Sequence, residues 1–181
     1  EKEGFNAVVT NGGIQSNHAR VVAIMAAQRG WPCRLVLHGK RESLTNPLGN
    51  LLMMLMAGAK TVVVPPDQIN ANICDEMKDL VKSGHKPFNI PGGAHNWLGA
   101  KSYVYAIEEL ISQTNGWLPD YIFHASGTGA TQAGLLAGLD KLSLKCKVMG
   151  ISVARKNPIG GRVVEQSYEE IRSKLGLTNK A

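Results

Sequence analysis

The chain has 181 residues with a formal charge of +6 at neutral pH, and 44% of its residues are hydrophobic while 19% are charged. This composition excludes a disordered chain and is typical of a globular protein with one domain or two small ones. No apolar stretch is long enough to span a bilayer, the first residues do not resemble a signal peptide, and the basic residues are scattered. We therefore expect neither a membrane nor a nucleic acid as a partner.

Apolar runs alternate with helix-like stretches along the chain. Six short runs predict strands, and apolar residues at helical spacing between them, such as Ile69, Ile73, Met77 and Leu80, predict crossover helices. Short buried strands joined by helices indicate an α/β fold with parallel sheets covered on both faces. In chain order, the predicted strands are residues 7–10, 33–38, 61–64, 87–90, 121–125 and 147–153.

The first strand–helix connection, Asn11-Gly-Gly-Ile-Gln-Ser-Asn-His18, is rich in polar residues. Gly12 and Gly13 are expected to form a tight turn, because glycine tolerates positive φ. Ser16 and Asn17 are good N-cap residues for a helix over 19–29. The unpaired N–H groups and the dipole of such a first turn favour an anion such as a carboxylate, although an ordinary capped turn explains the residues equally well.

A second connection of this kind follows the strand at 121–125. In Ser126-Gly-Thr-Gly-Ala-Thr131 the glycines allow backbone N–H groups to approach a phosphate, and the hydroxyl groups can add hydrogen bonds. A helix that begins near Thr131 and runs through Leu139 contributes its dipole. Two such turns suggest a ligand with a phosphate at one end and a carboxylate at the other.

The three cysteines, Cys33, Cys74 and Cys146, are far apart and form no CxxC pair. An odd number at these spacings favours free thiols over disulfides or metal ligands. We therefore expect no metal site, and a cytoplasmic location.

Both turns, with further motifs in the same order, resemble the fold-type II pyridoxal-phosphate (PLP) enzymes, in the branch of D-cysteine desulfhydrase and 1-aminocyclopropane-1-carboxylate (ACC) deaminase. The Gln-Ser-Asn motif is the most specific of these, and the resemblance covers nearly the whole chain. The matching segments are Gly13-Ile-Gln-Ser-Asn-His18, Asn89-Ile-Pro-Gly-Gly93, Leu98-Gly-Ala100, Tyr103-Val104, Ala125-Ser-Gly-Thr-Gly-Ala-Thr-Gln-Ala-Gly134 and Val148-Met-Gly-Ile-Ser-Val153.

The resemblance implies three-layer, open twisted parallel sheets, with a small domain over residues 1–92 and part of a large domain over 93–181. It implies PLP as the cofactor, a small amino acid as substrate and a homodimer for the complete enzyme. The implied reaction is α,β-elimination of D-cysteine to pyruvate, ammonia and sulfide, in which the cofactor ring serves as an electron sink. ACC deamination by ring opening is the alternative, and His18 after Ser-Asn favours the desulfhydrase.

Residue roles follow from the same resemblance. Asn17 matches the asparagine that hydrogen-bonds the 3-oxygen of the cofactor. Ser16, Asn17 and His18 match the positions that receive the substrate carboxylate, largely through backbone N–H groups, and Ser16 also matches a catalytic hydroxyl. The implied phosphate cradle is Gly127, Thr128, Gly129, Ala130 and Thr131.

The Schiff-base lysine of the family lies in a Gly-Asn-Lys-x-Arg-Lys motif upstream of the Gln-Ser-Asn turn, and these residues contain no such motif. The C-terminal segment that holds the pyridine nitrogen also has no counterpart. The resemblance therefore implies the central portion of the enzyme, which is not expected to turn over alone. Lys101, where the family has an apolar residue, is a candidate substitute, and non-covalent retention of PLP is the alternative.

Two other function classes fit parts of the sequence. Gly127-Thr-Gly129 with Ala133 loosely fits a dinucleotide turn, and Arg155 could favour the 2′-phosphate of NADP, but no acidic residue follows the next strand. A non-catalytic α/β fragment that binds a phosphorylated ligand or a protein is the third class. His95 either neighbours the substrate site or is an ordinary loop residue, and His124 either faces the site or is buried with a partner.

Overall fold

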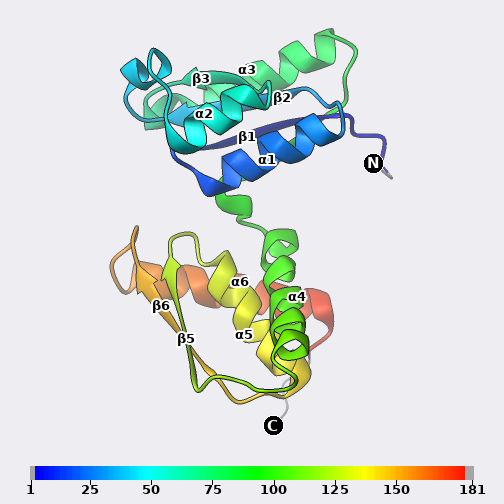
Figure 1. The fold of residues 1–181 in the computed structure, drawn as a ribbon, viewed down its shortest axis with the longest axis vertical. Helices are drawn as coiled ribbons and strands as arrows, with labels where there is room; N and C mark the ends of the chain where they lie inside the picture. The colour runs from blue at the N-terminus through cyan, green and yellow to red at the C-terminus, as the bar shows by residue number, and fades with distance from the viewer. Residues whose placement is uncertain (1–2, 178–181) are drawn as a thin grey trace. The chain divides into compact units, whose positions relative to one another are not determined.

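The computed structural model describes residues 3–177, and the chain divides into two compact units, Glu1–Gly93 and Ala94–Ala181. The α/β class of the predicted fold is confirmed, since parallel sheets and helices make up both units (Figure 1). The assignment of residues 1–92 and 93–181 to a small and a large domain of an enzyme stays a prediction.

The first unit is a four-stranded parallel sheet in the order β3-β2-β1-β4. Three helices connect the strands, and all four strands lie within three residues of the predicted bounds at either end. The elements are β1 (Ala7–Gly13), α1 (Asn17–Gln28), β2 (Cys33–His38), α2 (Gly49–Met56), β3 (Lys60–Val63), α3 (Ile69–Lys82) and β4 (Pro87–Ile90).

Two apolar clusters lie on opposite faces of this sheet. Val8, Leu35 and Leu37 pack with α1 and α2, whereas Val9 and Val36 pack with α3. Neighbouring residues of each strand thus enter different clusters, as expected where side chains alternate across a strand. The sheet is therefore covered on both faces, which is why its strands read as continuous apolar runs.

Gly12 and Gly13 do not form the turn that the sequence predicted. They extend β1, pairing with Leu37 and His38 of β2, and neither has a positive φ. The chain reverses after them, where the amide of Ser16 donates to the carbonyl of Gly13. Gly12 is needed for another reason, because a Cβ there would lie 2.8 Å from the side chain of Ser16.

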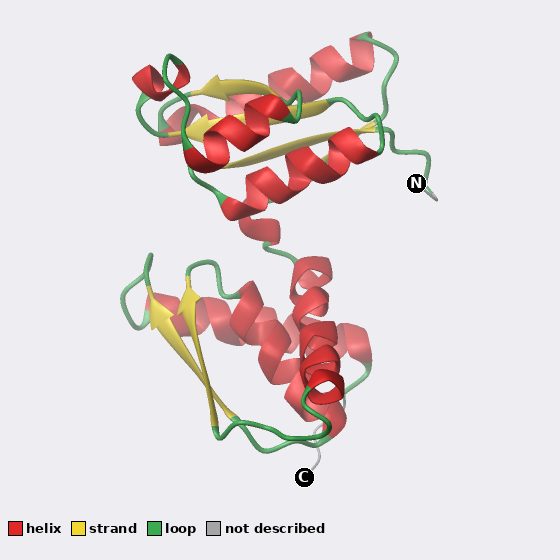
Figure 2. Ribbon diagram, in the orientation of Figure 1, coloured by secondary structure: helices red, strands yellow, loops and turns green. Residues whose placement is uncertain are grey.

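The second unit holds a pair of parallel strands and three helices that pack together (Figure 2). Helix α5 lies against α4, α6 and both strands. The elements are α4 (Trp97–Gln113), β5 (Tyr121–Ser126), α5 (Ala130–Leu142), β6 (Lys147–Ser152) and α6 (Ile159–Leu175).

The three helices lie on one side of the β5–β6 pair (Figure 2). Ile122 and Val148 pack toward the buried residues of α5, but alternate residues are exposed. Within residues 3–177, no helix covers that second face. Its large apolar side chains, which we call the open sheet face, are Tyr121, Phe123, Met149, Ile151 and Val153.

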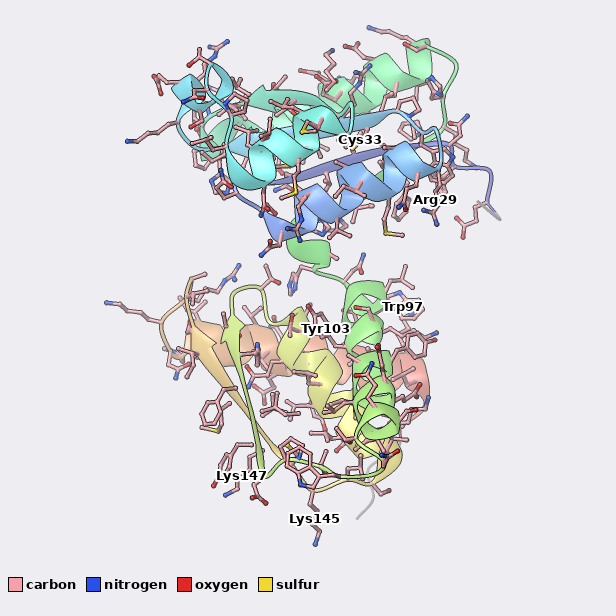
Figure 3. All side chains as sticks on the ribbon, viewed as in Figure 1. Arg29, Cys33, Trp97, Tyr103, Lys145 and Lys147 are labelled. Carbon is pink, nitrogen blue, oxygen red and sulfur yellow. The ribbon has the colours of Figure 1, made fainter. Side chains whose placement is uncertain are left out.

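No helix among the described residues is long and apolar enough to cross a membrane. The same part of the chain holds no cluster of histidine, cysteine and acidic side chains suited to a metal ion. Cys33 is buried on the sheet face covered by α1 and α2 (Figure 3), and this burial raises the pKa of its thiol to about 12. That thiol is a packing residue rather than a nucleophile.

Candidate functional site

The turn between β1 and α1 presents two backbone amides without partners. Ser16 is the N-cap of α1, and its Oγ accepts a hydrogen bond from the amide of Ala19 at 3.1 Å. The amide of Arg20 donates to the carbonyl of Ser16. The amides of Asn17 and His18 have no hydrogen-bond partner among residues 3–177, and they lie at the positive end of the helix dipole. This pair can receive a carboxylate.

His18 is held against β1 by a fully buried hydroxyl. Thr10 Oγ1 donates to the carbonyl of Ile90 at 2.7 Å and lies 2.9 Å from His18 Nε2. Since a hydroxyl has one proton, Thr10 must accept from His18, so Nε2 of His18 carries a hydrogen. Burial lowers the pKa of His18, which favours a neutral ring whose Nδ1 has a free lone pair.

The side chain of Asn17 is bonded to a residue from the next crossover. Its Oδ1 accepts from Nδ2 of Asn50, at 3.0 Å, and Asn50 lies in the first turn of α2. Gln15 joins the same group, because its Oε1 accepts from the amide of Asn50 at 2.9 Å. The Gln-Ser-Asn turn is therefore fixed by α2 as well as by its own cap.

The turn between β5 and α5 has unpaired amides as well. Gly129 is the N-cap with φ 88°, and α5 has no side-chain cap. The first helical hydrogen bond runs from the amide of Ala133 to the carbonyl of Gly129. The amides of Ala130, Thr131 and Gln132 therefore have no partner within the described part of the chain, and they suit a phosphate.

Glycine is required at the start of this helix. A Cβ on Gly129 would lie 3.1 Å from the backbone nitrogen of Val164 in α6, and its φ is positive. A Cβ on Gly127, by contrast, would meet nothing within 4 Å, so the carbon of Gly127 faces open space. The guanidinium of Arg155 donates to the carbonyl of Gly127 and brings a positive charge to the turn.

A cavity of about 540 Å³ adjoins this turn at the carboxyl ends of β5 and β6. Polar groups on its wall come from both strands, from α5 and α6, and from the connection between β6 and α6. They include Ser126, Gln132, Ser152, Asn157 and Glu165. The position agrees with the rule that ligands of parallel α/β sheets bind beyond the carboxyl ends of the strands.

Comparison with known proteins relates both turns to one family. The family described as "Pyridoxal-phosphate dependent enzyme" matches residues 1–179. The chain belongs to this family of PLP-dependent enzymes. The match removes the NADP-binding oxidoreductase alternative. The hydrogen-bond donors also fit PLP. The unpaired backbone amides at the start of α5 suit its phosphate, and the side-chain amide of Asn17 can bond a ring oxygen.

The named relatives come from the branch that the sequence motifs indicated. A Thermotoga maritima protein, provisionally named ACC deaminase, is 39% identical over 86% of this chain and 50% of its own length. A Yersinia enterocolitica D-cysteine desulfhydrase is 28% identical over 98% of this chain and 56% of its own length. A crystal structure titled as an ACC deaminase homologue is 30% identical with a TM-score of 0.84, and the match covers 99% of this chain and 55% of that one. The chain thus spans about half the length of the relatives it matches.

Lys101 and His124, two other residues considered from sequence for the PLP site, have local partners. Lys101 lies on α4 with its Nζ 5.8 Å and 5.6 Å from the ring centres of Trp97 and Tyr105, and Figure 3 shows Trp97 at the start of that helix. Asn96 caps α4 by accepting from the amide of Gly99, and His95 is exposed. His124 is half-buried in β5, and its Nδ1 is 3.1 Å from the carbonyl oxygen of Ala125.

Sequence reasoning missed three residues that hold the first turn. From the sequence, Thr10 looks like an ordinary strand residue, Asn50 like a loop residue and Arg20 like a surface residue of a helix. Thr10 was detectable in principle, because a hydroxyl at a buried strand position needs a partner. Nothing local in the sequence identifies Asn50, whose contacts with Gln15 and Asn17 span 35 and 33 residues.

Proposed function

We propose that this chain holds PLP and the amino-acid substrate of a lyase or deaminase, most like D-cysteine desulfhydrase. The observation that carries the proposal is the pair of helix starts with unpaired amides, in a chain that belongs to a PLP-dependent family. The relatives named as a desulfhydrase and a deaminase support this branch.

In this proposal the second unit holds the phosphate of PLP. The amides at Gly127, Thr128, Gly129, Ala130 and Thr131 donate to it, and Thr128 and Thr131 can add their hydroxyls. The dipole of α5 and the nearby guanidinium of Arg155 favour its negative charge. The bound cofactor supplies an electron sink for a carbanion next to the substrate nitrogen.

In the first unit we assign Asn17 to the 3-oxygen of the cofactor and the amides of Asn17 and His18 to the substrate carboxylate. Ser16 is the proposed catalytic hydroxyl. Its oxygen accepts a hydrogen bond from the amide of Ala19, so the hydroxyl proton of Ser16 remains available to donate to the substrate. Nδ1 of neutral His18 can accept a proton or a hydrogen bond.

ACC deamination is the second candidate, because the Thermotoga maritima relative has the higher identity. Stable adducts that join pyridoxal phosphate to D-cysteine or to ACC by a reduced C–N bond distinguish the two. They require no lysine, so calorimetry can measure their binding to the chain directly. Tighter binding of the D-cysteine adduct supports the desulfhydrase, and tighter binding of the ACC adduct supports the deaminase.

The first test of PLP binding is addition of PLP, reduction with borohydride and peptide mass analysis. The matched variant is Gly129→Ala, which strains the phosphate turn. We expect the wild-type chain to retain PLP non-covalently and the variant to lose most of it. A single reduced adduct at Lys101 would instead make independent catalysis credible, and failure to retain PLP in any form would contradict the proposal.

A further inference from the structure

We propose that Asn50, held by Arg20, sets the orientation of the Asn17 side-chain amide, so that its NH₂ group rather than its oxygen faces the ligand. Asn50 and Arg20 are then positioning residues. The inference deepens the proposed function, since it rests on Asn17 as the residue that meets the 3-oxygen of PLP. The geometry itself lies wholly within the first unit.

The argument begins with the ambiguity of an asparagine side chain. Its oxygen and nitrogen have nearly the same size, so the partners decide which end is which. Arginine is unambiguous, because a guanidinium only donates hydrogen bonds. Nη1 of Arg20 lies 3.1 Å from one end of the Asn50 amide, so that end must be the oxygen.

The other end of Asn50 is therefore its NH₂ group. It donates to the carbonyl of Gln15 at 2.9 Å, which is an independent check, since a carbonyl only accepts. The same NH₂ group lies 3.0 Å from the Asn17 side chain, so the atom of Asn17 that faces it must be Oδ1. The NH₂ group of Asn17 is left at the opposite end of the amide, directed away from Asn50.

This orientation matters for an oxygen ligand. The ring 3-oxygen of PLP, when deprotonated, can only accept hydrogen bonds, so it needs the NH₂ end of Asn17. If Asn17 turned over, its oxygen would face the ligand oxygen, and its NH₂ group would face that of Asn50. Arg20 and the carbonyl of Gln15 together fix the Asn50 amide, and Asn50 in turn decides which end of the Asn17 amide meets the ligand.

The start of α2 is built to bring Asn50 to this place. Gly49 has φ 58°, and a Cβ on it would lie 2.7 Å from Oε1 of Gln15. Gln15 uses Oε1 to accept from the amide of Asn50 and Nε2 to donate to the carbonyl of Leu48 at 3.0 Å. Backbone contacts therefore fix Asn50 independently of its own side chain, and changing that side chain should leave the turn folded.

The decisive variant is Asn50→Asp. The carboxylate still accepts from Arg20, but it presents an oxygen where the NH₂ group was, so Asn17 must turn over to donate to it. The probes are pyridoxine 5′-phosphate and its 3-deoxy analogue, measured by calorimetry. We expect the wild-type chain to prefer the 3-oxygen probe about tenfold, and the variant to lose that preference. The ratio between probes cancels any general repulsion from the added charge.

Asn72→Asp is the matched control, because this substitution adds the same charge. Asn72 lies on α3, and its side chain makes a local hydrogen bond to the carbonyl of Gln68. This control should keep the wild-type ratio. An Asn50→Asp chain that also keeps the ratio would overturn the proposal. Should that variant not fold, Asn50→Ala removes the NH₂ group that faces Oδ1 of Asn17, and it too should lower the ratio.

A second readout needs no ligand. The side-chain NH₂ signals of Asn17, assigned in ¹⁵N spectra by their loss in Asn17→Ser, should shift downfield in Asn50→Asp as they bond the carboxylate. Unchanged signals would overturn the inference. If the wild-type chain binds neither probe, the proposed function fails, while these spectra still decide how Asn17 is oriented.

Discussion

Thr10 satisfies two polar groups beneath the β1–α1 turn, one on β4 and one on α1. Thr10→Val keeps the shape of the side chain but removes both hydrogen bonds, leaving the part-buried carbonyl of Ile90 and the His18 N–H without this partner. We expect a loss of about 1–3 kcal/mol in the free energy of unfolding, measured with urea. Thr61→Val on β3, whose hydroxyl makes one 3.3 Å contact, is the control. Equal losses in both variants would contradict the role assigned to Thr10.

The lowered pKa of His18 predicts a pH dependence of stability. The unfolded chain binds a proton on this histidine more readily than the folded chain, so stability is complete above the ordinary histidine pKa of about 6.5. It falls as the pH drops below that value toward the folded pKa. Urea unfolding at several pH values between 7.5 and 5 should show the decline. His18→Gln should decline less steeply, and identical slopes would show that other groups cause it.

At the residue scale, the sequence predicted Ser16 as a cap and glycine at the start of α5, because both are local rules of helix termini. The predicted tight turn at Gly12 and Gly13 was wrong, since these residues pair with β2, and that pairing depends on residues more than twenty positions away. Asn50 and Arg20 were missed for the same reason. A hydrogen bond from a side chain 33 residues distant leaves no periodic or local signal.

Helices α4 and α5 approach closely because of two glycines one turn apart. A Cβ on Gly134 would lie 2.1 Å from the carbonyl oxygen of Ala100, and a Cβ on Gly138 would lie 2.9 Å from Ile107. Gly134→Ala should therefore lower the free energy of unfolding by about 1–3 kcal/mol despite the better helix propensity of alanine. Gly138→Ala should cost less, because side-chain atoms can yield.

Gly161 in α6 is the matched control for this prediction. A Cβ there would make only an ordinary 3.5 Å contact with Asn157. Gly161→Ala should be neutral or should stabilise the protein by up to about 1 kcal/mol. Thermal unfolding of the three variants gives the comparison, and a stable Gly134→Ala protein would mean that α4 and α5 can move apart at little cost.

At the element scale, the strands were predicted well because a strand buried on both faces contains a continuous apolar run, as in Ala7-Val8-Val9 of β1. The end of β1 was less accurate, since hydrogen-bond pairing rather than composition ends a strand. Composition also could not show that α5 lies on one face of the β5–β6 pair while the other face has no cover among the described residues.

At the scale of the whole molecule, the open sheet face is the feature that we expect to affect self-association in solution most strongly. Five large apolar side chains lie side by side on it, and Phe123 is 67% exposed. Such a patch favours self-association. We expect the apparent mass from light scattering to rise with concentration, and to rise less in Phe123→Thr, which keeps a good strand-forming residue.

Val81→Thr is the control for this prediction, because Val81 is 60% exposed but lies on α3 and is not one of the residues of the open sheet face. It should associate like the wild-type chain. If Phe123→Thr associates as strongly as Val81→Thr, some other surface drives the association.

The open sheet face also affects how unfolding of this protein should be followed. Fluorescent dyes such as ANS brighten on exposed apolar surface, and bright dye is usually taken as a sign of a partly folded state. Here the folded chain already offers such a surface in Tyr121 and its neighbours. Dye-based melting curves should begin from a high baseline, so tryptophan fluorescence or circular dichroism is the better signal for the variants described above.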